Sequence, residues 1–169
     1  MLYFSYGSNM SSRRLLARVP SARFVTVAVL PGHHLLFHKI GRDGSAKCDA
    51  AVAGGGQRVI GVVFDIAARE KPLLDRKEGL GNGYEQKWVR LTGAGGDPLE
   101  AVTYYATHTD PALRPFHWYK SHVLLGAREH RLPAAYVARI EAVEAIDDPD
   151  GERHRRELAI YADMAGGVP

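Results

Sequence analysis

The sequence predicts an α+β fold, in which about six short strands are followed and interrupted by helices. Two observations carry this prediction. Short runs rich in β-branched and aromatic residues alternate with turns rich in Gly, Pro, Asn and Asp, which is typical of strands. The connections between these runs are short, and short connections favour antiparallel pairing. We see no internal repeat, and we expect one domain over residues 1–169, a length that can bury a sizeable core.

The chain begins with an apolar, aromatic run that predicts a buried strand over residues 2–6. The strand ends at the turn residues Gly7, Ser8 and Asn9, and a helix is predicted over about 10–18, before Pro20. Backbone N–H groups in such a turn lack helix partners and point outward. With the positive end of the helix dipole behind them, they can receive a carboxylate, a phosphate or an oxyanion.

The next part of the chain predicts four strands, at 23–30, 33–39, 48–53 and 58–65. Pro31-Gly32 ends the first of these strands, and a turn is expected at 41–44. The triplet at 54–56 is all glycine, but neither a lysine nor a helix follows it, so it does not match a phosphate loop. We expect it to be a hairpin loop between its two flanking strands.

A short helix that ends at Glu78 carries the second candidate site. Pro72 suits its first turn, and Gly79 suits the position just past its end. Glu78 follows Leu74 by four residues, so both side chains share a face, and Leu74 should face the core. A carboxylate beside apolar surface at the negative end of a helix dipole should have a raised pKa. Such a carboxylate suits a general base, whereas a solvated glutamate beside the helix end is the alternative.

Strands at about 84–92 and 99–106 follow, joined by a glycine-rich loop. The remainder is helical. Helices are expected at about 116–129, from Pro133 onward and at about 152–163, and the segment 147–151 separates the last two. The second of these helices should place Tyr136, Ile140 and Val143 on one face, and the tail at 166–169 should be frayed.

Composition narrows the function classes. The formal net charge of +3 is mild, and no basic run is interleaved with aromatic residues, so a nucleic-acid partner is not expected. The longest apolar run, at 24–30, is too short to span a bilayer, and the first residues do not resemble a signal peptide. Cys48 is the only cysteine, which excludes an intrachain disulfide and suits a reducing compartment, with the cytoplasm as the expected location. Nothing near Cys48 in sequence supplies a base, so we expect it to pack inertly.

Other catalytic and metal motifs are weak or missing. His34 and His38 can face the same side of a strand, but no third ligand accompanies them, so we expect no metal site. His117 and His122 are five residues apart and do not share a helical face. The sequence contains neither a Gly-x-Ser-x-Gly elbow nor a Walker motif.

The ordered set of motifs resembles the γ-glutamylcyclotransferase family. The matching stretches run from 3–9 through 61–64 and 74–79, and then through 119–120, 126–129 and 132–136. Together they cover most of residues 2–146. The chain is most similar to the branch that acts on γ-glutamyl amino acids, because relatives that act on glutathione or γ-glutamylamines typically carry leucine where this chain has Asn9. The segment 110–118 and the tail depart from the animal members. The identity of the leaving group that the substrate carries therefore stays open.

The resemblance implies a small mixed β-barrel with inserted and appended helices and a ligand cavity at one mouth. It implies a cofactor-independent enzyme that converts a γ-glutamyl substrate into 5-oxoproline and a free amino acid or amine, with Glu78 as general acid and base. The turn Tyr6-Gly7-Ser8-Asn9 would hold one polar end of the substrate. Tyr84 follows the glycine loop after Glu78 and is expected to line the pocket with its hydroxyl. Tyr104 and Tyr119 match family positions near the cavity, and the alternative is that both are core aromatics with a bonded hydroxyl. Some relatives suggest a homodimer.

Two other functions stay open. One is a sibling enzyme that cleaves another γ-glutamyl conjugate, such as a γ-glutamylamine or a biosynthetic intermediate. The other is a binding module that keeps the cavity without turnover. Glu78 argues against the binding module, since a binder gains nothing from a carboxylate at the negative end of a helix.

Overall fold

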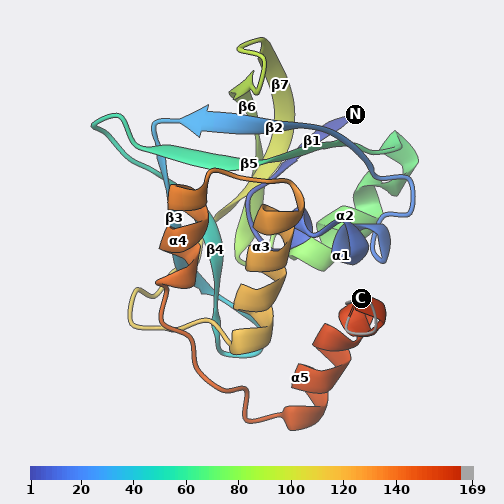
Figure 1. The fold of residues 1–169 in the computed structure, drawn as a ribbon, viewed down its shortest axis with the longest axis vertical. Coiled ribbons are helices and arrows are strands. Elements are labelled where there is room, and N and C mark those ends of the chain that lie inside the picture. Colours follow the sequence, from blue (N-terminus) through green and yellow to red (C-terminus); the bar gives the residue numbers. More distant parts are fainter. Residues whose placement is uncertain (165–169) are drawn as a thin grey trace.

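The computed structural model describes residues 1–164 and contains a closed five-stranded barrel with a two-stranded sheet beside it (Figure 1). Around the barrel the strands are β1 (Leu2–Ser5), β5 (Arg58–Asp65), β2 (Arg23–Pro31), β6 (Tyr84–Gly93) and β7 (Pro98–Ala106). The second sheet consists of β3 (His33–Ile40) and β4 (Ala46–Val52). Strand β1 closes the barrel, because it pairs antiparallel with β5 and parallel with β7. The α+β class and the small mixed barrel are therefore confirmed.

The glycine triplet at 54–56 is not a hairpin loop, so that prediction was wrong. Strand β4 pairs with β3, whereas β5 pairs with β1 and β2, so the two strands that flank the triplet do not pair with each other. Pro31 lies opposite Arg58, and His33 lies opposite Val52. Strands β2–β3 and β4–β5 thus form one long bent ribbon, and the triplet lies in an extra loop on one side of the bend. The turn of this ribbon is the one expected at 41–44.

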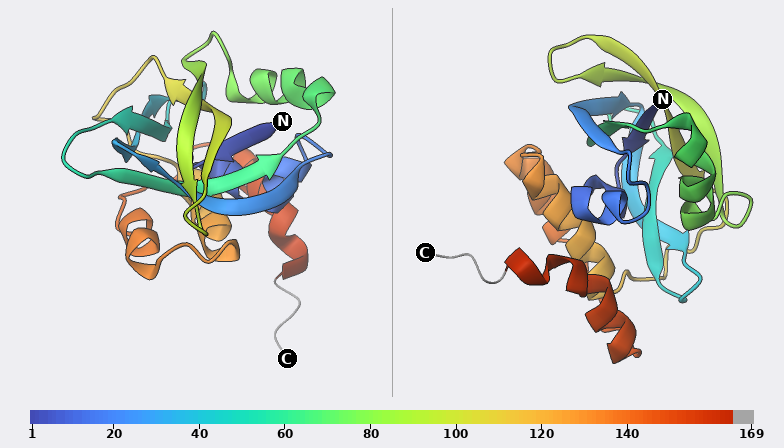
Figure 2. Two further views of the ribbon diagram at one scale, coloured as in Figure 1. Left: turned by 90° about the horizontal axis from the view of Figure 1, so that it is seen from above. Right: turned by 90° about the vertical axis from the view of Figure 1, so that its right-hand side faces the viewer.

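Most helices pack around the barrel and the second sheet, whereas the C-terminal helix extends away from the strands (Figure 2). Their bounds are η1 (Ser8–Met10), α1 (Ser12–Leu16), η2 (Ala68–Glu70), α2 (Lys71–Glu78), α3 (His117–Glu129), α4 (Ala134–Glu141), α5 (Gly151–Leu158) and η3 (Ala159–Met164), where η denotes a 3₁₀ helix. Val143 lies beyond the end of α4, and the last predicted helix continues past Leu158 as the 3₁₀ turn η3. The tail predicted to fray, at 166–169, lies outside the described residues.

The helix predicted over 10–18 is broken and shorter than expected. Ser8–Met10 forms a 3₁₀ turn, Ser11 is extended with φ −65° and ψ 116°, and the α-helix runs only from Ser12 to Leu16. The reason is tertiary: the backbone at Met10 and Ser11 lies directly against α3, and the Ser11 hydroxyl accepts a hydrogen bond from Tyr161 at 2.8 Å. These contacts fix a turn where local propensity favours a continuous helix.

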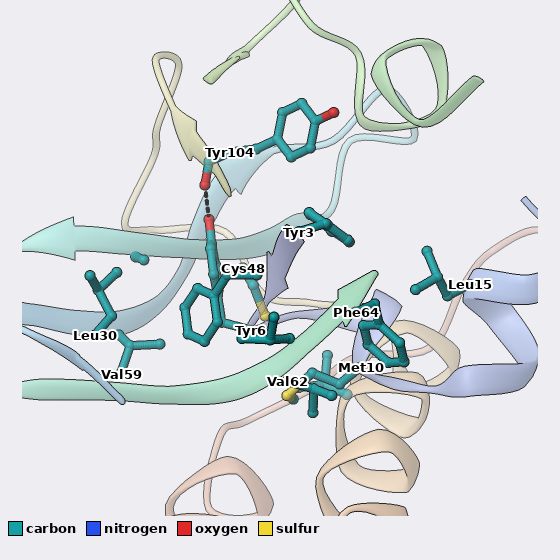
Figure 3. Close-up of a cluster of buried hydrophobic side chains, with 14 of the residues drawn as sticks. Tyr3, Tyr6, Met10, Leu15, Leu30, Cys48, Val59, Val62, Phe64 and Tyr104 are labelled. Carbon is teal, nitrogen blue, oxygen red and sulfur yellow. Dashed lines mark hydrogen bonds between the residues drawn. The ribbon is translucent and has the colours of Figure 1, made fainter. Parts of the chain in front are cut away.

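The core fills the barrel and continues between the barrel and its helices (Figure 3). Phe4, Val62 and Phe64, from the paired strands β1 and β5, are almost completely buried. Tyr6 lies at the end of β1, and its hydroxyl donates to the Tyr104 carbonyl of β7 at 2.6 Å. This bond fixes the start of the 7–9 turn against the barrel wall.

Gly126 of α3 lets this helix approach the turn after β1. A Cβ atom at Gly126 would lie 2.3 Å from Ser11 N and 2.5 Å from the Met10 carbonyl carbon, which are both backbone atoms. Neither atom can move away without displacing the turn. The glycine is therefore required by close approach and not by its backbone angles.

We predict that Gly126→Ala destabilises the fold by about 1–3 kcal/mol through overpacking. Alanine ordinarily stabilises a helix interior by up to about 1 kcal/mol relative to glycine, so a net loss would show that the contact outweighs propensity. Gly54→Ala is the control, because a Cβ there meets no atom within 4 Å. Urea unfolding of both variants tests the prediction, and a Gly126→Ala protein as stable as wild type would contradict it.

Candidate functional site

Glu78 ends helix α2 at a position that local sequence defines well. Gly79 follows in the left-handed region with φ 77° and caps the helix through its N–H bond to the Asp75 carbonyl. Leu74, one turn earlier on the same face, is completely buried and anchors the helix to the core. The Glu78 side chain therefore points inward, and 16% of its surface is exposed.

The carboxylate of Glu78 lies against the turn after β1. Its Oε1 accepts a hydrogen bond from Asn9 Nδ2 at 2.5 Å. Asn9 Nδ2 also lies 3.2 Å from the Tyr3 hydroxyl. The other side-chain atom, Asn9 Oδ1, accepts a hydrogen bond from Arg18 at 2.9 Å. Arg18 is itself 3.7 Å from Glu78 Oε1. The two stretches that the sequence singled out are thus in direct contact.

The environment of Glu78 raises its pKa. Burial is the largest cause, because it disfavours the charged form. The positive charges of Arg18, Arg14 and Lys39, together with the Asn9 hydrogen bond, act in the opposite direction and only partly offset burial. The carboxyl group is therefore suited to exchange a proton nearer to neutral pH than an exposed glutamate.

Glu78 stands where two cavities meet. An outer cavity of about 300 Å³ lies between the β3–β4 turn, α1, α3 and the end of α2. An inner cavity of about 30 Å³, which has room for about two water molecules, lies along residues 3–9. Four residues line both cavities, namely Ser8, Glu78, Tyr84 and Tyr119. The two cavities are therefore neighbours, and the Glu78 carboxylate borders both.

The turn at Gly7, Ser8 and Asn9 lines the inner cavity. The first hydrogen bond of η1 is donated by Met10 N–H to the Gly7 carbonyl at 3.0 Å, so the preceding N–H groups have no partner within the helix. A Cβ at Gly7 would lie 3.1 Å from Cys48 Cβ and 3.4 Å from the Tyr119 hydroxyl. The lack of a side chain at Gly7 keeps this narrow space open.

The candidate tyrosines all lie at the two cavities, but their hydroxyls are engaged by the protein. Tyr84 donates to the Cys48 carbonyl at 2.5 Å, and the Tyr119 hydroxyl accepts from Cys48 N–H at 2.9 Å. Tyr104 lines only the inner cavity and donates to Asp75 Oδ1 at 2.6 Å. Burial raises the pKa of Tyr6, Tyr84, Tyr104 and Tyr119 well above the usual value, so each keeps its proton.

Basic residues dominate the outer cavity, and the sequence did not identify them as site residues. Six cations line it, whereas three carboxylates do. The cations are Arg14, Arg18, Lys39, Arg42, Lys47 and Lys77, and the carboxylates are Asp43, Glu78 and Glu157. They lie in α1 and just after it, in β3, the β3–β4 turn and β4, and in α2 and α5, so no local motif marks them. The excess positive charge suits a ligand that carries carboxylates.

Comparison with known proteins agrees with this geometry. The model of the AIG2-like family matches residues 58–140. The human protein "Gamma-glutamylcyclotransferase" is 32% identical over 151 residues, which cover 86% of this chain and 80% of the relative, and the mouse protein of the same name is 31% identical. The chain belongs to the γ-glutamylcyclotransferase family.

Solved structures extend this family relationship to the fold. A structure described as "Gamma-glutamyl cyclotransferase" superposes with a TM-score of 0.85 at 27% identity and covers 99% of both chains. A human structure described as the uncharacterized protein loc79017 superposes with a TM-score of 0.80 at 30% identity, covering 86% of this chain and 89% of the other. The ordered motifs therefore identified the γ-glutamylcyclotransferase family correctly.

The chemistry of other residues is consistent with a site centred on Glu78. Burial raises the pKa of the Cys48 thiol to about 12, so the thiol is protonated and packs as an apolar group.

His38, one of the two strand histidines, has a carboxylate partner within the protein, because its Nε2 lies 2.9 Å from Asp49 Oδ2. Within the described residues, no group of three or more His, Cys, Asp and Glu side chains is arranged to hold a metal ion. None of the described helices combines the length and apolar character needed to cross a membrane.

The C-terminal helix contributes to the outer wall of the site through one buried network. Arg14 donates to Glu157 of α5 at 2.7 Å and lies 2.8 Å from His122 Nε2 of α3. His122 Nδ1 lies 2.7 Å from the Tyr161 hydroxyl, which donates to Ser11. Since Arg14 can only donate, His122 accepts at Nε2 and is neutral. The network joins the turn after β1 to α3 and α5.

Titration of His122 should make the protein less stable in mild acid. Burial lowers the pKa of His122 from 6.5 to about 4. The unfolded chain therefore binds more protons than the folded one between these values, and stability falls as pH drops from about 6.5 to about 4. We predict that His122→Gln flattens this part of the stability profile, whereas His34→Gln, at an exposed histidine, does not. Urea unfolding across this range checks it, and parallel profiles for wild type and His122→Gln would contradict it.

Proposed function

We propose that this chain is a γ-glutamyl cyclotransferase that releases 5-oxoproline and a free amino acid or amine, acting in the cytoplasm without a cofactor. One observation supports the proposal most strongly: a buried carboxylate with a raised pKa stands between a cavity lined by cations and a turn with free backbone N–H groups. Membership of the γ-glutamylcyclotransferase family supports the same reaction.

The substrate supplies its own nucleophile. The α-amine of a γ-glutamyl group can attack the γ-carbonyl carbon and close a five-membered ring, so that no water is consumed. A reaction within one molecule reaches a high effective concentration when the amine is held in line, so positioning provides much of the acceleration. The protein must therefore fold the glutamyl chain and manage its protons.

Glu78 would move the protons. Its carboxylate takes one proton from the substrate ammonium and thereby frees the lone pair for attack on the carbonyl carbon. As the carbon–nitrogen bond to the leaving group breaks, Glu78 gives that proton to the leaving nitrogen. The ring nitrogen then gives its surplus proton to the released amine, which departs as an ammonium ion, and becomes the lactam N–H. Glu78 ends as it began, as a carboxylate.

The turn Tyr6-Gly7-Ser8-Asn9 would hold the glutamyl end of the substrate. The inner cavity is too small for a whole glutamyl group, so only a carboxylate or the developing oxyanion would enter it. Backbone N–H groups suit either group electrostatically. Tyr84, Tyr104 and Tyr119 would shape the walls, since their hydroxyls already bond to the protein.

Two alternatives remain to be tested against this proposal. A sibling activity on another γ-glutamyl conjugate would use the same carboxylate with a different occupant of the outer cavity. A binding module would hold the ligand without turnover. A panel of γ-glutamyl substrates with different leaving groups separates the siblings, and 5-oxoproline formation separates enzyme from binder.

We predict that Glu78→Gln abolishes 5-oxoproline formation from γ-glutamyl-L-alanine and keeps ligand binding. Glutamine matches the shape of the carboxyl group but cannot accept a proton. Product assay and calorimetric binding on both proteins provide the measurement. Loss of binding together with product would instead assign Glu78 a structural role, and product from the variant would remove Glu78 from the mechanism.

The pH dependence of the reaction should follow the charge beside Glu78. Arg18 is the strongest of the groups that oppose the raised pKa of Glu78, so Arg18→Gln should raise that pKa further. Because the base must be ionised, the rate is lost as pH falls through this pKa, and the acid limb of kcat/KM should move to higher pH. Arg13→Gln, at an exposed arginine of the preceding helix α1, serves as the control. An unmoved or lowered acid limb in Arg18→Gln would contradict the assignment.

A further inference from the structure

Lys39 is a buried lysine at the wall of the outer cavity. Only 5% of the residue is exposed, although it lies near the end of β3 and next to an exposed residue. Its Nζ lies 4.7 Å from the centre of the Tyr84 ring. A Cβ at Gly83 would lie 3.1 Å from the same Nζ, so the missing side chain at Gly83 makes room for the ammonium. The Lys39 side chain thus extends from β3 and lies against the loop that follows α2.

A bulge in β3 turns Lys39 toward the cavity. The register between β3 and β4 shifts between Phe37 and Lys39, so that Lys39 lies opposite Lys47. Directly opposed residues of an antiparallel pair lie on the same face, and a bulge changes which residues are opposed. Two lysines consequently line the outer cavity together. Such a pair of like charges needs anions to balance it.

The other cations of the cavity already have partners or face solvent. Lys47 donates to Asp43 at 2.7 Å, Arg14 donates to Glu157 at 2.7 Å, and Arg18 donates to Asn9 at 2.9 Å. Arg42 and Lys77 are exposed. In the part of the chain that the structure describes, no oxygen accepts a hydrogen bond from Lys39 Nζ. The ammonium of Lys39 is therefore left facing the outer cavity, where a ligand carboxylate can become its hydrogen-bond partner.

Lys39 is also close enough to Glu78 to act on its charge. Its positive charge is among those that oppose the raised pKa of the Glu78 carboxyl. Both residues line the outer cavity, with the Tyr84 ring as a shared neighbour. A group bound to Lys39 would therefore sit near the atoms that exchange protons with Glu78.

We propose that Lys39 binds the α-carboxylate of the leaving amino acid, so that the enzyme favours γ-glutamyl amino acids over γ-glutamylamines. This inference rests on the proposed cyclotransferase function. In a γ-glutamyl amino acid, the carboxyl carbon of the leaving amino acid is two bonds from the nitrogen of the bond that breaks. Its carboxylate, lying in the outer cavity, can therefore reach a cation beside Glu78. A γ-glutamylamine has no carboxylate to pair with that ammonium, so it would lose this charge-assisted hydrogen bond.

The test compares two substrates that differ only in this carboxylate. γ-Glutamyl-L-alanine carries it, and γ-glutamylethylamide is the same molecule without it. We predict that Lys39→Met lowers kcat/KM for γ-glutamyl-L-alanine by about 10- to 100-fold, the effect of losing one charge-assisted hydrogen bond. The comparison is made on the pH plateau, where Glu78 is ionised in both proteins; there the turnover of γ-glutamylethylamide should fall far less than that of γ-glutamyl-L-alanine, and this residual turnover also reports that the variant is folded. Lys39→Arg should restore most of the loss.

Lys87→Met is the matched control. Lys87 is also a half-buried lysine over a tyrosine ring, at 5.2 Å from Tyr105, but it does not line either cavity. It should leave both substrates unchanged. If Lys39→Met does not fold, Lys39→Gln replaces it.

Equal losses on both substrates would overturn the inference, because they would assign Lys39 to the glutamyl end or to the pKa of Glu78. Unchanged kinetics on both substrates would also overturn it. Wild-type protein that forms 5-oxoproline from neither substrate would instead overturn the proposed function, and the inference with it.

Discussion

The hydrogen bond between Asn9 and Glu78 is the contact on which the site depends. It joins residues 69 positions apart in the chain, one in the turn after β1 and one at the end of α2. The barrel fixes the first partner, since β1 pairs with both β5 and β7. Buried Leu74 and the Gly79 cap fix the second. Because Gly126 has no side chain, α3 lies directly against the backbone of this turn and holds it from outside.

Burial outweighs ion pairing in the electrostatics of the site. Glu78 receives a neutral amide as its hydrogen-bond donor, and the guanidinium of Arg18 stays 3.7 Å away. A direct ion pair would hold the carboxylate charged and lower its pKa. Because the charge of Arg18 only partly offsets burial, the pKa of the Glu78 carboxyl group stays raised.

Elements that depend on local sequence were predictable, whereas contacts between distant segments were not. The strands and the helix ending at Glu78 followed from residue patterns and from Pro72 and Gly79. The glycine triplet at 54–56 was misinterpreted because turn composition does not say which strands pair. The break at Ser11 escaped prediction because α3 causes it from more than a hundred residues away.

The candidate site was predicted in its centre but not in its outer wall. Glu78 and the turn at 7–9 carry local signals, namely a capped helix end and a strand–turn–helix junction. Lys39 and Glu157 carry none, since their position in the cavity depends on a bulge and on the packing of the C-terminal helix. For Lys39 the sequence shows only a lysine near the end of an apolar strand. That position does not reveal whether the side chain lines a cavity or lies in solvent.

The central claim is that Glu78 is a buried carboxyl group with a raised pKa between two cavities. An infrared titration of the carboxyl and carboxylate bands, compared between wild type and Glu78→Gln, tests it directly. The account predicts that the difference between the two proteins is one group that titrates above the range of ordinary glutamates. If the missing group instead titrates at or below that range, Glu78 is a solvated or ion-paired carboxylate, and the account of the site is wrong.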